Sequence, residues 1–230
     1  MSGSGGRISA GKSGGGNWRY GGNLTWHSPE LELNDIGFLR QADEIRQDIY
    51  VRYQFLKPTK LFRGSNIRLG QSTTYDFEGN HNRFQIDGGM FVNWKNNWWT
   101  EAGFEYNPKI FINTFLRGGP RWRFSEANFR FLFVGSDQSK KFNFTLGYVN
   151  SIAKQDNFKL FRYVLRFGYQ PTNALNFSFE TAFIESPNKT QYVSQKAFGS
   201  TTRYILGEID QQTWSTSLRV NYSLNPNLSL

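Results

Sequence analysis

Residues 157–184 carry the most regular alternation of apolar and polar positions in the chain. Between residues 161 and 169, apolar side chains fill the odd positions, and arginine and glycine stand among the even ones. A period of two is typical of a β-strand with one apolar and one polar face. Residues 171–174, Pro-Thr-Asn-Ala, interrupt the pattern with turn-forming residues, and the alternation resumes at Leu175. The pattern predicts an antiparallel hairpin with two long strands.

The length and chemistry of this hairpin indicate a membrane protein. Each strand runs to about 10 residues, whereas strands of soluble domains cluster near 5 to 6, and a tilted bilayer crossing needs about 9 to 11. The apolar face is rich in aromatic residues, and the other face carries Arg162 and Arg166, which a soluble core rarely admits unpaired. We therefore expect a transmembrane β-barrel with its aromatic face toward lipid and its polar face toward the lumen.

The same pattern predicts the register of the hairpin. The lipid-facing residues of both strands have odd numbers, and a four-residue turn then sets Arg166 opposite Glu180 and Phe167 opposite Phe179. A slip of one residue would turn Arg162 and Arg166 toward lipid, at a cost of about 2 to 4 kcal/mol each near the midplane. The register should therefore be strongly specified.

Similar alternation recurs along most of the chain. The fold class that it predicts is all-β: an antiparallel up-and-down transmembrane β-barrel or part of one, with about 12 to 14 strands, short periplasmic turns and long outer loops. Short turns are expected at residues 57–60, 95–97, 171–174 and 225–227. If all lie at one end of the barrel, an even number of strands must separate successive turns. The count between 95–97 and 171–174 comes out odd, which indicates one misread strand within residues 107–128.

Composition is compatible with this fold and excludes a helical membrane protein. The chain is 38% hydrophobic and 17% aromatic, its mean hydropathy is -0.58, and no stretch of about 18 uncharged apolar residues occurs. A β-barrel needs no such apolar stretch, because the residues that face its lumen are polar. The 22 Phe, 11 Tyr and 7 Trp residues suit lipid-facing bands and interfacial girdles.

The net charge of +9 suggests contact with polyanions such as nucleic acid, lipopolysaccharide or acidic glycans. Many of the basic residues, however, alternate with apolar ones along strands, so we expect them to line a lumen or to lie in loops, and we expect no nucleic acid partner. The absence of cysteine removes disulfides and thiolate metal sites. The candidate lumen-facing residues are Arg52, Asp87, Glu101, Glu105, Arg162, Arg166, Glu180 and Arg219.

Two long segments interrupt the strand pattern. Residues 28–43 are acidic and lack clean alternation, so they are expected to form a long outer loop. Residues 186–212 are also long and polar, with a short strand expected at 203–209. The first loop either stays solvated or folds into the barrel mouth as a plug that pairs with lumen arginines. The plug candidates are Glu30, Glu32, Asp35, Arg40 and Asp43.

The sequence predicts neither an enzyme nor a bound cofactor or metal. It contains two histidines and no cysteine, so no cluster of metal ligands is visible. Glu101 and Glu105 share one strand face, as glycosidase carboxylates would, but alternate positions of any lumen-facing strand do so. Residues 6–13, GRISAGKS, match the phosphate-binding loop pattern but lack the preceding apolar strand and the following helix that give the motif its mechanism.

The ends of the sequence suggest a piece of a larger protein. Residues 1–6, Met-Ser-Gly-Ser-Gly-Gly, are typical of an added flexible linker, and residues 7–230 are interpreted as one β-barrel domain. No secretory signal is visible, and the sequence stops just after the expected turn at 225–227, so we expect the closing strands to be missing. Because lipid does not tolerate unpaired strand edges, missing strands or a partner chain would complete the barrel.

Three motifs carry a resemblance to a known family: residues 28–43, SPELELNDIGFLRQAD; residues 116–120, LRGGP; and residues 135–141, GSDQSKK. The chain from Arg7 onward resembles the C-terminal barrel domain of large outer-membrane proteins of Bacteroidetes-type bacteria. In that family, a family-9-like carbohydrate-binding domain precedes a barrel of unknown function. The resemblance implies a bacterial outer-membrane location and a link to glycan handling, and it supplies no catalytic residues.

Two functions remain open at this point. The first is a non-enzymatic outer-membrane barrel, serving as a pore or as the membrane anchor of a surface glycan-handling protein, in contact with the lipid bilayer or lipopolysaccharide. The second is a soluble, aromatic-rich β-sheet domain that binds carbohydrate. Dependence on detergent would separate the two.

Overall fold

The computed structural model of the chain describes residues 2–32, 42–153, 158–225 and 228–229. Every secondary-structure element assigned in these ranges is a β-strand. The described residues form no helix that is long and apolar enough to cross a membrane. The strands are β1 (Gly5–Lys12), β2 (Trp18–His27), β3 (Glu44–Phe55), β4 (Phe62–Tyr75), β5 (His81–Trp94), β6 (Trp99–Ile112), β7 (Trp122–Phe124), β8 (Ala127–Gly135), β9 (Phe142–Ala153), β10 (Lys159–Thr172), β11 (Leu175–Glu185), β12 (Asn188–Phe198), β13 (Thr201–Ile209), β14 (Gln212–Asn225) and β15 (Leu228–Ser229).

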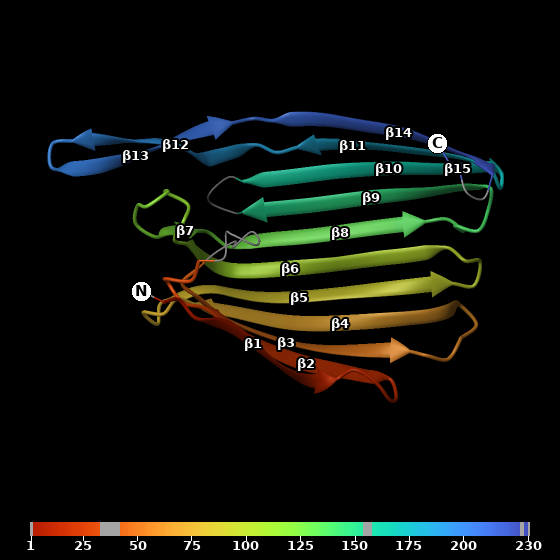
Figure 1. Cartoon of the computed structure of the whole chain (residues 1–230), viewed down its shortest axis with the longest axis horizontal. Helices are drawn as coiled ribbons and strands as arrows, with labels where there is room; N and C mark the ends of the chain where they lie inside the picture. The colour runs from red at the N-terminus through yellow and green to blue at the C-terminus, as the bar shows by residue number, and fades with distance from the viewer. Residues whose placement is uncertain (1, 33–41, 154–157, 226–227, 230) are drawn as a thin grey trace.

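In this part of the chain, 13 strands form one antiparallel sheet (Figure 1). The order runs from β1 to β6, continues through β8, β9, β10, β11 and β14, and ends at β15, while the short β7 pairs with the end of β6. Several strands, such as β4 and β10, have 14 residues, which is enough for a tilted bilayer crossing. The predicted all-β, up-and-down architecture is confirmed.

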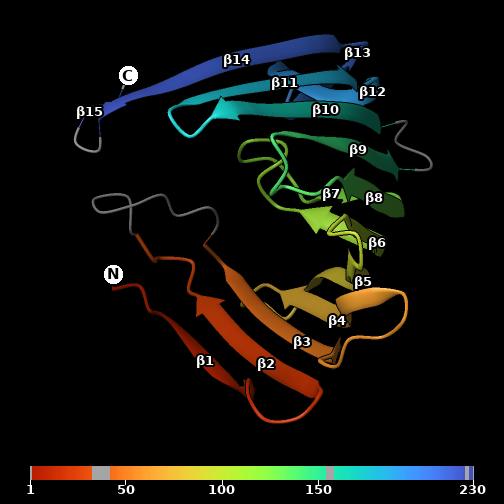
Figure 2. The ribbon, with the colours of Figure 1, turned by 90° about the vertical axis from the view of Figure 1, so that its right-hand side faces the viewer.

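The sheet curls into an open arc (Figure 2). β1 lies at one edge and β14 with β15 at the other, and no pairing among the described residues joins the two edges. A twisted sheet of this many strands tends to coil toward closure. The arc therefore has the shape of an incomplete barrel wall.

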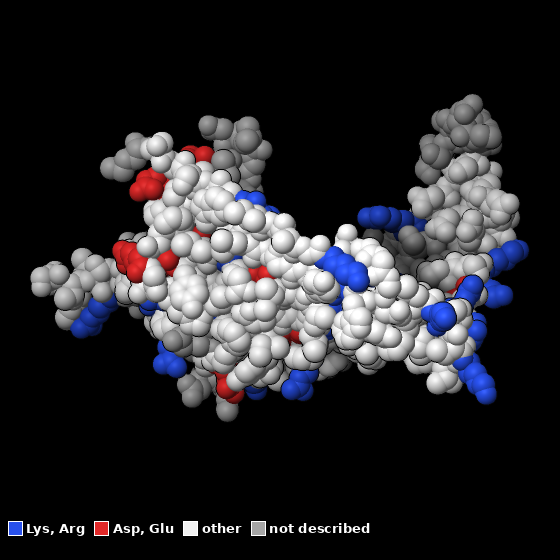
Figure 3. All heavy atoms as spheres, turned by 90° about the horizontal axis from the view of Figure 1, so that it is seen from below, with Lys and Arg blue, Asp and Glu red and all other residues white. Residues whose placement is uncertain are grey.

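Strand pairing divides the side chains into a concave and a convex face, because directly opposed residues point to the same side of a sheet. When the pairs are followed from β1 to β14, every exposed large hydrophobic residue of these sheet strands falls on the convex face. Leu69 is 52% exposed, Leu146 50% and Trp214 73%. Figure 3, seen from the side of β1 to β3, shows a broad uncharged area with charged atoms mainly toward its margins.

A conventional hydrophobic core is almost absent from the described residues. The apolar side chains that are buried there include Val92, Val164 and Leu116, and Leu116 belongs to the connection between β6 and β7. One layer of sheet has no second layer to cover its apolar face. The exposed large apolar residues of the sheet strands therefore remain on the convex surface.

The register of the β10–β11 hairpin is the one that the sequence predicts. Arg166 faces Glu180, Phe167 faces Phe179 and Gly168 faces Ser178. Arg166 Nε donates to Glu180 Oε2 at 3.0 Å. The alternation of apolar and polar residues was sufficient here, because a one-residue slip would exchange the two faces.

Three of the predicted short turns, those between β3 and β4, β5 and β6, and β10 and β11, lie at one end of the arc together with the β8–β9 connection (Figure 1). The five-residue β4–β5 connection lies at the other end. The odd strand count is also explained: β6 extends to Ile112, and β7 pairs back onto that same end instead of crossing the wall. Four full strands, β6, β8, β9 and β10, then separate the two turns.

Two other segments differ from the expectation. Residues 186–212 contain two strands, β12 and β13, which form a separate two-stranded ribbon beyond the long-loop end of the wall. The β12 sequence is polar on both faces, which is why its alternation was not recognised. At the other end of the chain, β1 starts at Gly5, so this strand includes the last two residues of the segment interpreted as a linker.

Hydrogen bonds tie neighbouring turns together at the short-turn end. Asn97 Nδ2 in the β5–β6 turn donates to Asp137 Oδ2 in the β8–β9 turn at 3.0 Å. Ser139 adds its backbone N–H and its hydroxyl to Asp137 Oδ1, at 2.9 and 2.7 Å. Asn97 makes the largest contribution, followed by Ser139, and together these donors lower the pKa of Asp137 from 3.8 to about 2. Hydrogen bonds to a carboxylate favour its charged form.

This depressed pKa predicts an acid-sensitive link between the turns. The stabilisation by Asp137 is complete above its usual pKa of 3.8 and is lost as the pH falls toward about 2. The urea midpoint of the wild type should therefore decline relative to that of Asp137→Asn between pH 4 and pH 2, since the amide does not titrate. A constant difference between the two proteins across this window would contradict the prediction.

Candidate functional site on the concave face

All eight side chains predicted to face a lumen lie on the concave face. The pairing places Arg52 on β3, Asp87 on β5, Glu101 and Glu105 on β6, and the others on β10, β11 and β14. Their common face follows from the register, since each strand turns alternate residues to the same side. The structure separates the eight into two groups, in two hollows of the wall.

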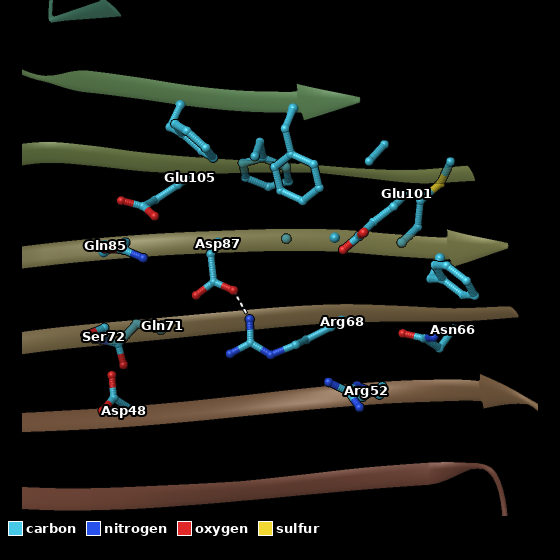
Figure 4. Close-up of a pocket in the computed structure, with 18 of the residues that line it drawn as sticks. Asp48, Arg52, Asn66, Arg68, Gln71, Ser72, Gln85, Asp87, Glu101 and Glu105 are labelled. Carbon is cyan, nitrogen blue, oxygen red and sulfur yellow. Dashed lines mark hydrogen bonds and ion pairs between the residues drawn. The ribbon is translucent and has the colours of Figure 1, made fainter. Parts of the chain in front are cut away.

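The first basin is a hollow of about 480 Å³ between β3 and β8 (Figure 4). Its lining contains three arginines and four acidic residues. An ion pair joins Arg68 to Asp87 across neighbouring strands, and Arg46 Nη2 lies 2.9 Å from Asp48 Oδ1. Most of the charge in this basin is therefore neutralised locally.

A row of arginines crosses one side of this basin. Arg19 is directly opposite Arg52, and Arg52 is directly opposite Arg68. Like charges in opposed positions repel each other, but Asp87 compensates Arg68. Arg52 Nε is buried and has no hydrogen-bond partner. Arg52 Nε is therefore an unsatisfied buried donor in this row.

Toward the long-loop end of the first basin, three side chains form a closed hydrogen-bonded group. Arg83 donates to Glu105 Oε1 at 2.9 Å and to Asn107 Oδ1 at 2.8 Å. Asn107 Nδ2 donates to the same Glu105 oxygen at 2.9 Å. Glu105 therefore has a fixed position, and its charge is balanced by Arg83.

The second hollow, which we call the basic basin, has a volume of about 610 Å³ and lies between β9 and β14. Arg162, Arg166 and Arg219 line it together with one acid, Glu180. Glu180 is paired with Arg166. The basic basin therefore has an excess of positive charge that the first basin lacks.

An aromatic strip lies between the two basins, which the sequence analysis did not anticipate. Phe129, Phe131 and Phe133 of β8 lie on the concave face, because Phe133 is opposite Glu101 and Phe129 is opposite Glu105. The ring centroids are 6.0 and 6.2 Å apart along the strand. The expectation that aromatic side chains face outward is therefore wrong for β8.

Glycines on the flanking strands accommodate this strip. A Cβ at Gly103 of β6 would lie 2.6 Å from the Phe131 ring, and the Phe133 ring lies over Gly147 of β9. Paired aromatic and glycine positions are a known device for filling a strand surface. This pairing is the sequence signal that was missed, and it becomes visible only once the strand register is known.

The aromatic strip leads to a third, more apolar hollow at the long-loop end. This hollow has a volume of about 370 Å³, and Phe115, Phe124, Phe129 and Phe158 line it together with Arg83, Glu105 and Asn107. Trp99 lies at the opposite end, over Gly135. An apolar path with polar flanks therefore follows β8 along the concave wall.

The predicted plug residues are placed only in part. Asp43 Oδ1 accepts the backbone N–H of Phe77 at 2.9 Å, which attaches the end of the loop to the β4–β5 turn. Glu30 and Glu32 are exposed, and Asp35 and Arg40 lie outside the described residues. The plug remains a prediction.

The described residues contain no group of three or more His, Cys, Asp or Glu side chains that could hold a metal ion. Residues 6–12 of the phosphate-loop match form strand β1, which pairs with β2. The concave face offers charged and polar side chains that can bind polar solutes. The absence of enzymatic activity remains a prediction.

The Arg166–Glu180 pair provides a test of the concave wall. Arg166→Glu should lower the free energy of unfolding in detergent by less than about 1 kcal/mol, because both side chains are partly exposed. The exchanged double variant Arg166→Glu with Glu180→Arg should recover most of that loss. Urea titration of all variants would measure the coupling, and an exchanged variant no more stable than the single one would exclude direct pairing.

The comparisons with known proteins agree with this geometry. A solved structure, an anion-selective porin from Comamonas acidovorans, matches with a TM-score of 0.52 and 16% sequence identity. The match covers 93% of this chain and 57% of the porin chain, so this chain spans little more than half of that protein. At this identity, the similarity shows a porin-like all-β fold.

Sequence comparison gives the family. No curated protein matches the sequence. The model of a domain of unknown function, DUF5916, matches residues 1–230. The chain therefore belongs to the DUF5916 family.

Proposed function

We propose that this chain forms part of the wall of a non-enzymatic β-barrel in a bacterial outer membrane. The convex face contacts lipid and lipopolysaccharide, and the concave face lines an aqueous lumen. Short turns face the periplasm, and the long connections with the β12–β13 ribbon face outward. This arrangement follows the general plan of outer-membrane barrels.

One observation carries the proposal: the apolar side chains of a long-stranded, single-layer sheet lie uncovered on its convex face. Exposed side chains on neighbouring strands, such as Ile67 and Leu69 on β4 with Ile49 and Val51 on β3, form a continuous apolar surface. Soluble monomers rarely expose apolar patches beyond a few hundred Å². Lipid covers such a surface at no cost in solvent exposure.

Arg130 is an exposed charge on this convex face. It lies three residues after the start of β8 at Ala127, at the long-loop end of that strand. A long arginine side chain can extend its guanidinium toward the interface from such a position. Arg130 is therefore compatible with a membrane wall.

The open edges require additional strands. Lipid offers no partners for the free backbone groups of β1 and β14, so a further segment or a partner chain completes the barrel. The similarity to a porin over 57% of its chain supports this arrangement. Because that porin is anion-selective, the similarity favours a pore over a purely anchoring role here.

The link to glycans rests on the aromatic strip and on the family resemblance. Aromatic rings with carboxylates at their side, such as Phe133 beside Glu101, suit a sugar ring: one surface stacks and the hydroxyl groups bond to the acid. We infer that the barrel serves a surface glycan-handling protein of Bacteroidetes-type bacteria, with a family-9-like carbohydrate-binding domain before it. Nucleic acid is not a partner in this proposal.

The alternative is a soluble, aromatic-rich sheet that binds carbohydrate. The same aromatic strip would provide its binding surface. It would, however, leave the convex face in water, including Trp214 at 73% exposure. That cost makes the membrane wall the better proposal.

A matched pair of substitutions separates these two proposals. Leu69→Arg on the convex face should cost about 2 to 4 kcal/mol of stability in a bilayer if it lies near the midplane. Gln85→Arg adds the same charge to the concave face, near Asp87 and Glu105 (Figure 4), and should cost far less. Unfolding in phospholipid vesicles would measure both.

In a soluble sheet, Leu69→Arg would replace an exposed side chain and change stability by no more than about 0.5 kcal/mol. A stable, monodisperse Leu69→Arg variant in buffer without detergent would therefore exclude the membrane wall.

A further inference from the structure

The basic basin has the composition of an anion site. Its lining contains Arg162, Arg166 and Arg219, and Glu180 is the one acidic residue in it. Because Glu180 pairs with Arg166 at 3.0 Å, two guanidinium groups remain without an acid in the lining. The first basin, in contrast, has four acidic residues for three arginines.

The arginine that lies deepest in this basin is incompletely satisfied. Arg162 Nε is buried and has no hydrogen-bond partner. Its paired neighbours on the adjacent strands are Val149 and Ile184, which offer no side-chain acceptor. Buried donors are nearly always bonded in folded proteins, so an orphaned guanidinium nitrogen indicates a missing acceptor.

The register places the two uncompensated arginines on opposite sides of the ion pair. Arg166 is level with Glu180, Gly168 is level with Ser178, and Ser178 is level with Arg219. Arg219 therefore lies one row toward the short-turn end, while Arg162 lies four residues along β10 toward the long-loop end. Six residues along a strand span about 20 Å, so a small anionic solute lies beside one of these two arginines and does not bridge them.

The remaining lining supports the same chemistry. Thr145, Ser178, Ser215 and Ser217 provide small hydroxyl groups around the arginines. The Asn143 side chain lies over Gly168, where a Cβ would be 2.6 Å from its Oδ1, and it adds an amide group to the lining. Arginine forks combined with hydroxyl donors form strong, charge-assisted hydrogen bonds to phosphate and carboxylate oxygens.

We propose that the basic basin binds solutes that carry phosphate or carboxylate groups, with Arg162 and Arg219 as separate anion-binding positions on either side of the Arg166–Glu180 pair. The site rests on the proposed function in one respect, since it requires the concave face to be open to water. Such a site makes anionic solutes the preferred class in the lumen. The aromatic strip lies beside this site.

Equilibrium binding tests the site without any measurement of transport. Pyrophosphate and citrate, as phosphate and carboxylate probes, would be titrated calorimetrically into the full chain in a neutral detergent at low salt. We expect one or both to bind, and Arg162→Gln to weaken that binding at least about tenfold, because a hydrogen bond to a charged group contributes more than a neutral one. Arg219→Gln should weaken binding at the other position to a similar extent.

The matched control is Lys60→Gln. Lys60 is exposed in the β3–β4 turn, so this variant loses the same charge but leaves the basic basin intact, and its affinity should stay within about twofold of the wild type at this ionic strength. Arg162→Lys should retain part of the affinity, which distinguishes a lost contact from a misfolded protein. Binding of citrate alone would identify carboxylate solutes, and binding of pyrophosphate alone would identify phosphates.

Three outcomes would overturn the proposal: no binding of either probe to the wild type, equal loss in Lys60→Gln and Arg162→Gln, or unchanged affinity in Arg162→Gln. The result is separable from that of the membrane test. A water-soluble Leu69→Arg variant that still binds pyrophosphate would disprove the membrane wall and leave the anion site in place.

Discussion

The whole structure depends on one constraint, the pairing of every strand within a single layer. Successive side chains of a β-strand point alternately to the two faces of the sheet. Residues directly opposite each other on paired strands point to the same face, so the orientation of one strand fixes that of the next. With no second layer in the described part of the chain, the apolar face has no protein partner, and large residues such as Leu69 and Trp214 stay uncovered. This uncovered apolar face is the basis of the proposed membrane location.

The concave face shows how the same wall handles charge. Between β3 and β6, arginines and acids on adjacent strands compensate one another, as Arg68 does with Asp87 and Arg83 with Glu105. Between β9 and β14, three arginines surround one paired acid. Charge pairs add little to stability at this level of exposure, so their arrangement matters more for which solutes the surface favours.

Glycine and phenylalanine together define the border between these two regions. The rings of Phe131 and Phe133 occupy the space that Gly103 and Gly147 leave free on the neighbouring strands. They place an apolar path on the face that also carries the two charged basins. In the proposed membrane barrel, the sheet itself screens this path from lipid.

The sequence by itself determined the class of fold and the register of one hairpin. Strict alternation in β10 and β11 was enough to place Arg166 opposite Glu180, because any slip by one residue would exchange polar and apolar faces. The same reasoning assigned eight charged residues to one face, and the register agrees for all of them.

Only the tertiary structure decided how those residues are grouped and which face β8 presents. Residues of β8 are apolar on both sides, with Phe131 and Phe133 against Leu132 and Val134, so periodicity could not orient the strand, and its pairing with Glu101 and Gly147 did. The polar β12 strand and the folding of β7 back onto β6 were likewise beyond local pattern. Alternation within a strand shows which residues share a face. Which way that face points, and which charged residues lie together on it, depends on pairing with neighbouring strands that are distant in sequence.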